Sequence, residues 1–268
     1  MFDTCASTRQ NVGMTDLMPQ LPGSVCIAKK DALFDDLALA VMAAADAAIA
    51  ARGVFHLALS GGSTPEPFYM GLVIDPRYRE LPWDKTHIWI VDERRVADDD
   101  ERLNAKMIRE TLVDHVPMRQ RQFHPMQVME QDPAGLYIEE LCTVFDCDTK
   151  GAPPRLDFVL LGMGDDAHTA SLFPKSDALH ESEKWIAVNE GDAVTPPPRV
   201  TMTYPLLNAA GELAVLLVGA KKQATIEAIE KQLSNGGPDI ENMPITGIEP
   251  ASGHLTWYLD DAAAGVAD

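Results

Sequence analysis

The chain has 268 residues, 46% of them hydrophobic, and a formal net charge of −19 at pH 7. This length and hydrophobic content are sufficient for one large folded domain. The negative charge argues against a nucleic-acid partner and an anionic membrane surface, because both select basic faces. No apolar run approaches the roughly 20 residues that a membrane-spanning helix needs.

The N-terminal residues and the cysteines carry no targeting or metal-binding motif. Residues 1–23 lack a basic start and a continuous apolar core, so we expect a disordered tail ahead of a single domain at residues 24–268. The four cysteines show no Cys-x-x-Cys spacing, which argues against zinc and predicts reduced thiols in a cytoplasmic protein. The acidic run Asp98–Glu101 predicts a solvated loop rather than a metal site.

Helical and extended patterns alternate along the rest of the chain. Helical spacing of apolar residues predicts helices at 31–52, 65–72, 102–115, 133–146 and 221–233. Apolar runs predict strands at 55–59, 87–91, 158–161, 185–188, 199–203, 213–218 and 255–259. This alternation predicts an α/β fold: a Rossmann-like, mainly parallel sheet with helices on both faces. The strands after Trp185 are expected to form a small edge subdomain.

The strand at 55–59 runs into a loop suited to binding an anion. This loop reads Ser60-Gly61-Gly62-Ser63-Thr64, and Pro65 opens the next helix. Backbone N–H groups and the helix dipole both favour a phosphate at such a turn. No Gly-Lys-Ser/Thr follows, so the loop is not a Walker A motif. It also lacks the Gly-x-Ser-x-Gly elbow of serine hydrolases, which assigns its serines to phosphate binding.

The strand at 158–161 ends in a turn that carries acid–base groups. Gly162-Met-Gly164 allows a tight turn and close approach of a ligand, and Asp165, Asp166 and His168 follow it. Open α/β folds bind ligands at the carboxyl ends of their strands, where these side chains would lie. Either aspartate could orient the imidazole.

Basic residues are few, and three are expected to gather around a phosphate. Arg94 follows the strand at 87–91, although pairing with surface acids would also explain it. Arg199 follows three prolines, and a fixed backbone beside an arginine suits phosphate binding. Lys222 opens a helix, where the dipole disfavours a cation unless the side chain is solvated or an anion is near. Thr195–Pro198 is a candidate loop to close over the site.

Five segments in this order resemble the 6-phosphogluconolactonases of the glucosamine/galactosamine-6-phosphate isomerase superfamily. They are Ser60–Pro65, Val91–Val96, Gly162–Pro174, Pro198–Thr203 and Gly219–Lys222, within a similarity from about Ser24 to about Ala264. The chain departs from the family pattern at Ala167, where glycine is usual, and at Leu103, where serine is usual. Ala167 would strain the loop if its position requires a positive φ.

The resemblance implies hydrolysis of 6-phospho-D-glucono-1,5-lactone to 6-phospho-D-gluconate in the oxidative pentose phosphate pathway, without cofactor or metal. It implies a catalytic pair, His168 and Asp166, with Asp166 preferred to Asp165 as the partner. The implied binding residues are Ser60, Gly61, Gly62, Ser63, Thr64, Asp92, Arg94, Gly162, Gly164, Arg199 and Lys222. The expected partner is the phosphosugar lactone alone, bound by a monomer or a weak homodimer.

The chemistry agrees with these residue types. A sugar δ-lactone is an activated ester, so the enzyme must position it, deprotonate a water and stabilise an oxyanion. An imidazole suits the base, because its unperturbed pKa lies near 6.5. Backbone N–H groups of Gly162-Met-Gly164 are candidate oxyanion donors. The other histidines at 87, 115, 124, 180 and 254 have no motif around them and are expected to be structural.

Two alternatives remain. Glucosamine-6-phosphate deaminases resemble the chain in the Ser-Gly-Gly-Ser-Thr-Pro loop and in a Gly-x-Gly-x-Asp-Gly-His segment. In them an Ile-Ala-Phe-Asn-Glu-Pro-like stretch follows the histidine, whereas here Thr169–Pro174 has the lactonase form. The second alternative is a non-catalytic sensor of phosphosugars, which the departure at Ala167 keeps open.

Overall fold

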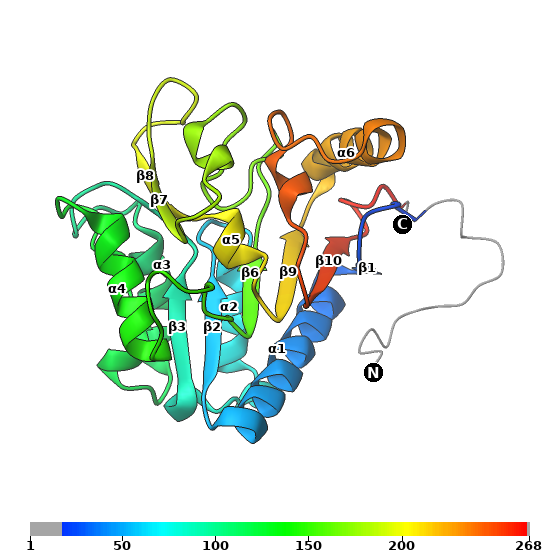
Figure 1. The fold of residues 1–268 in the computed structure, drawn as a ribbon. Helices are drawn as coiled ribbons and strands as arrows, with labels where there is room; N and C mark the ends of the chain where they lie inside the picture. Colours follow the sequence, from blue (N-terminus) through cyan, green and yellow to red (C-terminus); the bar gives the residue numbers. More distant parts are fainter. Residues whose placement is uncertain (1–17, 267–268) are drawn as a thin grey trace.

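The computed structural model describes residues 18–266, and its centre is a seven-stranded parallel sheet. The strands lie in the order β1-β10-β9-β6-β2-β3-β5 (Figure 1). Their bounds are β1 Ser24–Ala28, β2 Phe55–Leu59, β3 Thr86–Ile90, β5 Phe123–His124, β6 Phe158–Leu161, β9 Glu212–Leu217 and β10 His254–Asp260. Within residues 18–266, no helix is long and apolar enough to cross a membrane.

A second, three-stranded sheet is antiparallel. It consists of β4 (Asp92–Arg94), β8 (Arg199–Met202) and β7 (Ile186–Asn189), with β8 in the middle. Because β4 follows β3 almost directly, this small sheet starts at the carboxyl end of a central strand. The sequence suggested an edge subdomain built from the strands after Trp185. Of these strands, β7 and β8 join the small sheet, whereas β9 and β10 lie in the main sheet. Figure 1 shows β8 above the main sheet.

Within residues 18–266, six α-helices connect the strands and lie on both faces of the main sheet. They are α1 Lys30–Arg52, α2 Glu66–Ile74, α3 Asn104–Thr111, α4 Pro133–Phe145, α5 Tyr204–Leu207 and α6 Gln223–Gly236. The chain moves in one direction along the sheet from β1 to β5 and in the other from β5 to β10. Right-handed connections therefore place α1, α2 and α3 on one face, and α4 and α5 on the other. Figure 1 shows α4 and α5 in front of the sheet and α2 behind it.

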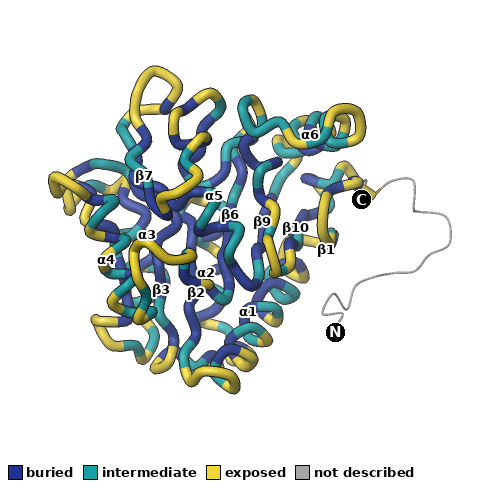
Figure 2. Tube along the Cα trace, viewed as in Figure 1, coloured by how far each residue is buried: buried dark blue, intermediate teal, exposed yellow. Residues whose placement is uncertain are grey.

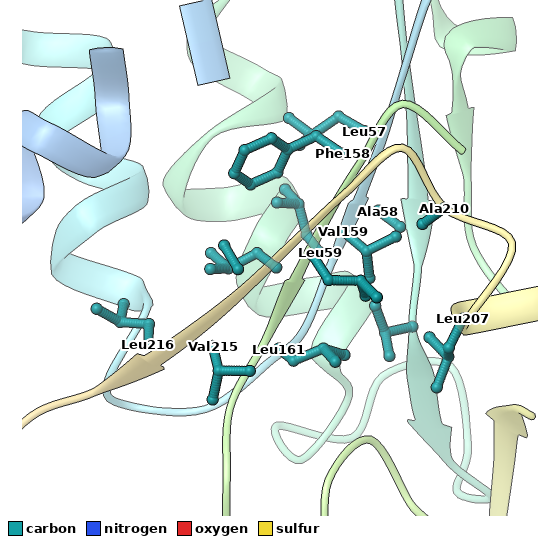
Figure 3. Close-up of a cluster of buried hydrophobic side chains, with 14 of the residues drawn as sticks. Leu57, Ala58, Leu59, Phe158, Val159, Leu161, Leu207, Ala210, Val215 and Leu216 are labelled. Atoms are coloured by element: carbon teal, nitrogen blue, oxygen red, sulfur yellow. The ribbon is translucent and has the colours of Figure 1, made fainter. Parts of the chain in front are cut away.

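Apolar periodicity determines how these elements pack. On α1, Leu33, Leu37 and Val41 follow one another at intervals of four and are buried, and Gly53 ends the helix with a left-handed φ of 77°. All residues of β2 and β6 are buried, as expected for parallel strands covered on both faces. Figure 3 shows their side chains meeting those of β9, and Figure 2 shows exposure concentrated in helices and loops.

The α/β fold and its mainly parallel sheet are confirmed, whereas three strands, β1, β4 and β5, were not predicted. β5 has two residues and β4 is the polar sequence Asp-Glu-Arg, so neither shows an apolar run. The helix expected at 102–115 ends at Thr111 and is followed by a 3₁₀ turn at Val113–His115. The helix expected from Lys221 begins at Gln223, after a 3₁₀ turn at Ala220–Lys222.

The N-terminal boundary of the fold also differs from the expected one. Of the predicted tail at residues 1–23, residues 1–17 lie outside the described part of the chain. Leu21, however, is buried in the core, and the indole N–H of Trp257 donates to Pro22 O at 2.8 Å. Packed structure therefore begins before Ser24, the boundary that the sequence suggested, and it continues into β1 beside β10.

Candidate active site

Four adjacent strands of the main sheet end at one edge, and each is followed by a segment that the sequence singled out. In spatial order the strands are β9, β6, β2 and β3. They lead to Lys222, to the Gly162–His168 turn, to the Ser60–Thr64 loop and to Asp92, respectively. The connections after β2 and β6 leave in opposite directions, so the two loops flank the point where strand order reverses. Such a switch point is where open α/β sheets bind ligands.

A cavity of about 250 Å³ opens at this edge. It is lined by Ser60, Gly61, Gly62, Ser63, Thr64, Pro65, Asp92, Arg94, Asn104, Gly162, Met163, Gly164, His168, Ala170, Ser171, Phe173, Arg199, Leu216 and Lys222. Every predicted binding residue and His168 therefore line one cavity. Asp166 does not line the cavity. It is connected to the cavity through its hydrogen bond to His168. None of the residues Thr195–Pro198, predicted to close over the site, lines it.

The structure pairs His168 with Asp166. His168 Nδ1 lies 2.6 Å from Asp166 Oδ1, which also accepts from the backbone N–H of His168 at 3.2 Å. This hydrogen bond is the main reason that the pKa of Asp166 is below its usual value. An ionised Asp166 places the ring proton on Nδ1 and leaves Nε2 as the nitrogen that can accept a proton. The pair has the orientation that carboxylate and imidazole take in hydrolytic triads.

Gly164 makes room for this pair. A side-chain carbon at position 164 would lie 2.1 Å from His168 Nδ1 and 2.5 Å from Asp166 Oδ1, closer than real atoms approach. The backbone N–H of Gly164 donates to His168 O at 2.9 Å, which closes the turn. This amide is therefore not available as an oxyanion donor, and the expectation for it was wrong. Gly164 shapes the turn instead.

Asp165 has a different partner from Asp166. Its Oδ1 lies 2.5 Å from Lys222 Nζ, and its backbone carbonyl accepts from Thr225 Oγ1 at 2.9 Å. The lysine holds the pKa of Asp165 below its usual value. The sequence left both aspartates open as partners of His168, and the geometry connects Asp165 to the segment before α6.

Two arginines face the same cavity side by side. Arg94 and Arg199 are directly opposed across the antiparallel β4–β8 pair. Among the described residues, no salt bridge includes either of them; Arg94 donates to Arg102 O and Arg199 to Pro197 O. Burial, and then the charge of Arg94, lower the pKa of Arg199. Opposed like charges are unfavourable unless something neutralises them, so the arrangement fits an anion in the cavity.

Unsatisfied polar atoms support the same interpretation. Three buried side-chain atoms of the described residues have no hydrogen-bond partner, and Ser60 Oγ and Arg94 Nε are two of them. Both residues line the cavity. Buried polar groups are normally paired, so these atoms fit a ligand that carries hydrogen-bond acceptors. Gly62, in the same loop, has a positive φ of 106°, which glycine adopts without strain.

Sequence analysis missed the roles of Glu93 and Asn104. Glu93 is fully buried and accepts three backbone N–H groups, those of Arg94, Asn104 and Ala105, at 2.7–2.8 Å. It thereby caps α3, although it lies eleven residues before Asn104. Asn104 in turn donates to Asp92 O at 2.7 Å and lies so close to Gly61 that a side chain there would collide with it. The position of Glu93 just after the apolar strand at 87–91 was the one signal in the sequence that could have indicated its role.

Comparison with known proteins agrees with this geometry. Residues 28–257 match the family described as glucosamine-6-phosphate isomerases/6-phosphogluconolactonase. Curated 6-phosphogluconolactonases of Nostoc sp. and Synechocystis sp. are each 39% identical over 81% of this chain and over 87% and 86% of their own lengths. The chain belongs to this family. The 6-phosphogluconolactonase structure from Leishmania guyanensis has a TM-score of 0.77 and 26% identity, covering 92% of this chain and 100% of that chain.

Both departures from the usual lactonase pattern are visible in the structure. Ala167 has a φ of 62°, so its position does require the left-handed conformation that glycine adopts freely. Its carbonyl accepts from Ile245 N at 3.0 Å, which holds the turn in place. Leu103 is the residue before α3 and provides no side-chain cap, so capping depends on Glu93. Neither change removes a group from the His168–Asp166 pair.

Proposed function

We propose that this chain hydrolyses 6-phospho-D-glucono-1,5-lactone to 6-phospho-D-gluconate, with His168 as the general base. The observation that carries the proposal is that one cavity contains both an imidazole oriented by a carboxylate and two arginines without carboxylate partners. The pair can deprotonate water, and the arginines can neutralise a phosphate in the same cavity. The named relatives catalyse the reaction that needs both functions.

The proposed reaction uses His168 twice. Nε2 takes a proton from a water molecule as the water attacks the lactone carbonyl carbon, and Asp166 stabilises the imidazolium that forms. The tetrahedral intermediate then collapses with cleavage of the bond to the ring oxygen. The imidazolium returns its proton to that oxygen, which becomes the free hydroxyl of the product. No covalent enzyme intermediate and no metal enter this sequence.

The phosphate is proposed to lie between the Ser60–Thr64 loop and the β4–β8 pair. Ser60 Oγ and Arg94 Nε would gain the partners that they lack, and Arg199 would lie against the opposite oxygens. Lys222 is proposed to contact the phosphate from the side of β9, where Asp165 holds its side chain. With a net charge of −19, attraction of an anionic substrate must come from these short-range groups.

Conversion of freshly generated lactone, coupled to 6-phosphogluconate dehydrogenase, tests this function. We expect rapid turnover that survives dialysis against EDTA, because no group of three His, Cys, Asp or Glu within residues 18–266 could hold a metal ion. Ammonia release from glucosamine 6-phosphate would favour the deaminase alternative, and phosphosugar binding without turnover would favour the sensor. We further propose a cytoplasmic monomer or weak homodimer that binds no nucleic acid.

A further inference from the structure

The C-terminal end of α4 brings two cysteine side chains together. The helix ends at Phe145, and Asp146 takes a left-handed conformation with a φ of 52°. Backbone N–H groups of Asp146 and Cys147 are both directed to Cys142 O, the latter at 3.1 Å. When a helix ends in a left-handed residue, the side chain of the next residue contacts a side chain in the last turn of the helix. Here these side chains are Cys147 and Cys142.

The two thiols are positioned for bond formation. Cys142 Sγ and Cys147 Sγ lie 3.4 Å apart, in hydrogen-bond contact. A disulfide needs about 2.05 Å between the two sulfurs, so the thiols lie close together but must approach further to form the bond. Both residues are half-buried, and their neighbours Thr143, Asp146 and Asp148 are exposed, so a small reagent can reach the sulfurs. Cys26 is buried elsewhere, with its thiol 3.5 Å from Asp36.

We propose that Cys142 and Cys147 form a redox-active dithiol that reacts with low-molecular-weight disulfides. The thiolate of Cys147 attacks one sulfur of the reagent, forming a mixed disulfide and expelling one reagent thiolate. The thiolate of Cys142 then attacks the sulfur of Cys147, closing the internal disulfide and expelling the second reagent thiolate. The protein loses two protons and two electrons, and the reagent becomes two thiols.

The surroundings indicate the order of attack and the kind of reagent. Burial, and then the contact with Cys147, raise the pKa of Cys142 to about 11, which makes Cys142 the poorer nucleophile at neutral pH. Asp146 and Asp148 flank Cys147, so an uncharged or cationic disulfide should approach more readily than an anionic one.

Closure would link the last turn of α4 to the residue that follows the helix, away from the catalytic cavity. Phe145, between the two cysteines, stacks on His56 of β2 with ring centroids 4.0 Å apart. Neither cysteine lines the cavity that contains His168. The dithiol is therefore a modification site on the face of the sheet that α4 covers, and its chemistry does not depend on the proposed lactonase function.

Exposure of the native protein to hydroxyethyl disulfide, followed by alkylation and tryptic mass spectrometry, tests the proposal. Residues 122–150 form one tryptic peptide that contains both cysteines. We expect this peptide to lose the mass of two hydrogens and resist alkylation. Cys142→Ser should instead accumulate a stable mixed disulfide at Cys147. Absence of reaction, or mixed disulfides persisting in the wild-type protein, would overturn the proposal.

Repeating the reaction in urea shows how much of the tendency to form the internal disulfide comes from the fold and how much from the short spacing of the two cysteines in the sequence. The ratio of internal to mixed disulfide reports the effective concentration of one thiol at the other. We expect this ratio to be at least about tenfold higher in the native protein than in the unfolded chain. Equal ratios would show that the turn at Asp146 does not arrange the pair.

Discussion

At the scale of single residues, the cavity combines groups that would be unfavourable without a ligand. Arg94 and Arg199 are opposed across β4 and β8, and Ser60 Oγ has no hydrogen-bond partner. An enzyme that binds an anion needs such unsatisfied donors before the substrate arrives. The sequence predicted these residues from their motifs: Ser60 and Arg94 follow strands that end at the same edge of the sheet, and Arg199 follows three prolines.

Replacing Arg94 or Lys222 by alanine should discriminate between substrates. A charge-assisted hydrogen bond is worth roughly 1.5–3 kcal/mol, so each loss should lower kcat/KM for the phosphorylated lactone by about 10- to 100-fold. Unphosphorylated gluconolactone should be affected far less. Steady-state kinetics on both lactones give the comparison, with Lys221→Ala as the control because Lys221 is exposed and does not line the cavity. Equal losses on both lactones would place the phosphate site elsewhere.

Other residue roles could not be predicted from local patterns, because they depend on turns that the pattern does not specify. The residues alone left Asp165 and Asp166 as equivalent partners of His168; only the family resemblance favoured Asp166, which the turn at Ala167 brings to the imidazole. Glu93, in β4, gains its role from burial against a helix that begins eleven residues later. No local pattern reports such a contact.

At the scale of elements, the start of α3 depends on a carboxylate outside the helix. Both carboxyl oxygens of Glu93 accept backbone N–H groups, so Glu93→Gln would turn its NH₂ towards one of these donors. We expect the KM for the phosphorylated lactone to rise by about tenfold, since one charge-assisted bond is worth roughly 1.5–3 kcal/mol, while kcat changes less. Glu110→Gln, an exposed change on the same helix, is the control. An unchanged KM in a folded Glu93→Gln protein would show that the cap does not position the binding loop.

The turn after β6 should accept glycine but not a β-branched residue at position 167. Ala167 has a φ of 62°, and a β-branched side chain is strained there by about 1–3 kcal/mol. Ala167→Val should therefore lower the free energy of unfolding by about that amount and reduce turnover, whereas Ala167→Gly should keep both near wild type. Urea denaturation measures the stabilities, with Ala187→Val in β7 as a control in extended backbone. Equal stability of the valine variants would contradict a strained turn.

Elements were predictable where the apolar pattern was long enough. The buried strands β2, β3, β6, β9 and β10 each contain at least four residues and have clear apolar runs. β5 has only two residues. β4 is polar, and its carboxylate Glu93 can be buried because backbone N–H groups donate to it. These short strands form only because neighbouring strands already provide an edge to pair with.

At the scale of the whole molecule, the face covered by α4 contains a buried histidine cluster, of which the sequence expected His87 and His124 to be structural. His87 Nδ1 lies 2.8 Å from His124 Nε2, and His124 Nδ1 lies 2.6 Å from Glu140. His56 accepts from the indole of Trp89 at 3.2 Å. Burial lowers the pKa of His56 to about 3 and that of His87 to about 4.

These depressed pKa values predict acid-labile stability. As the pH falls below about 6.5, the unfolded chain binds protons that the folded chain excludes, so the free energy of unfolding falls until the folded pKa values are reached. The slope for a buried histidine is up to about 1.4 kcal/mol per pH unit, less for the half-exposed His87. Urea denaturation between pH 7 and 4.5 should show this decline, and His56→Gln should flatten it while the exposed-site variant His180→Gln should not. If the free energy of unfolding of His56→Gln fell with pH as steeply as that of the wild type, His56 would not be the source of the pH dependence.

The central claim is that His168 activates water for lactone hydrolysis, and one comparison tests it most directly. Wild-type protein and His168→Asn are assayed on freshly generated 6-phosphogluconolactone, and binding of the product is measured by calorimetry on both. Loss of a general base should lower kcat by about 10²- to 10⁴-fold. Product affinity should stay within a few-fold of wild type, because the phosphate groups are intact. A variant that turns over the lactone within a few-fold of wild type would remove His168 from the mechanism.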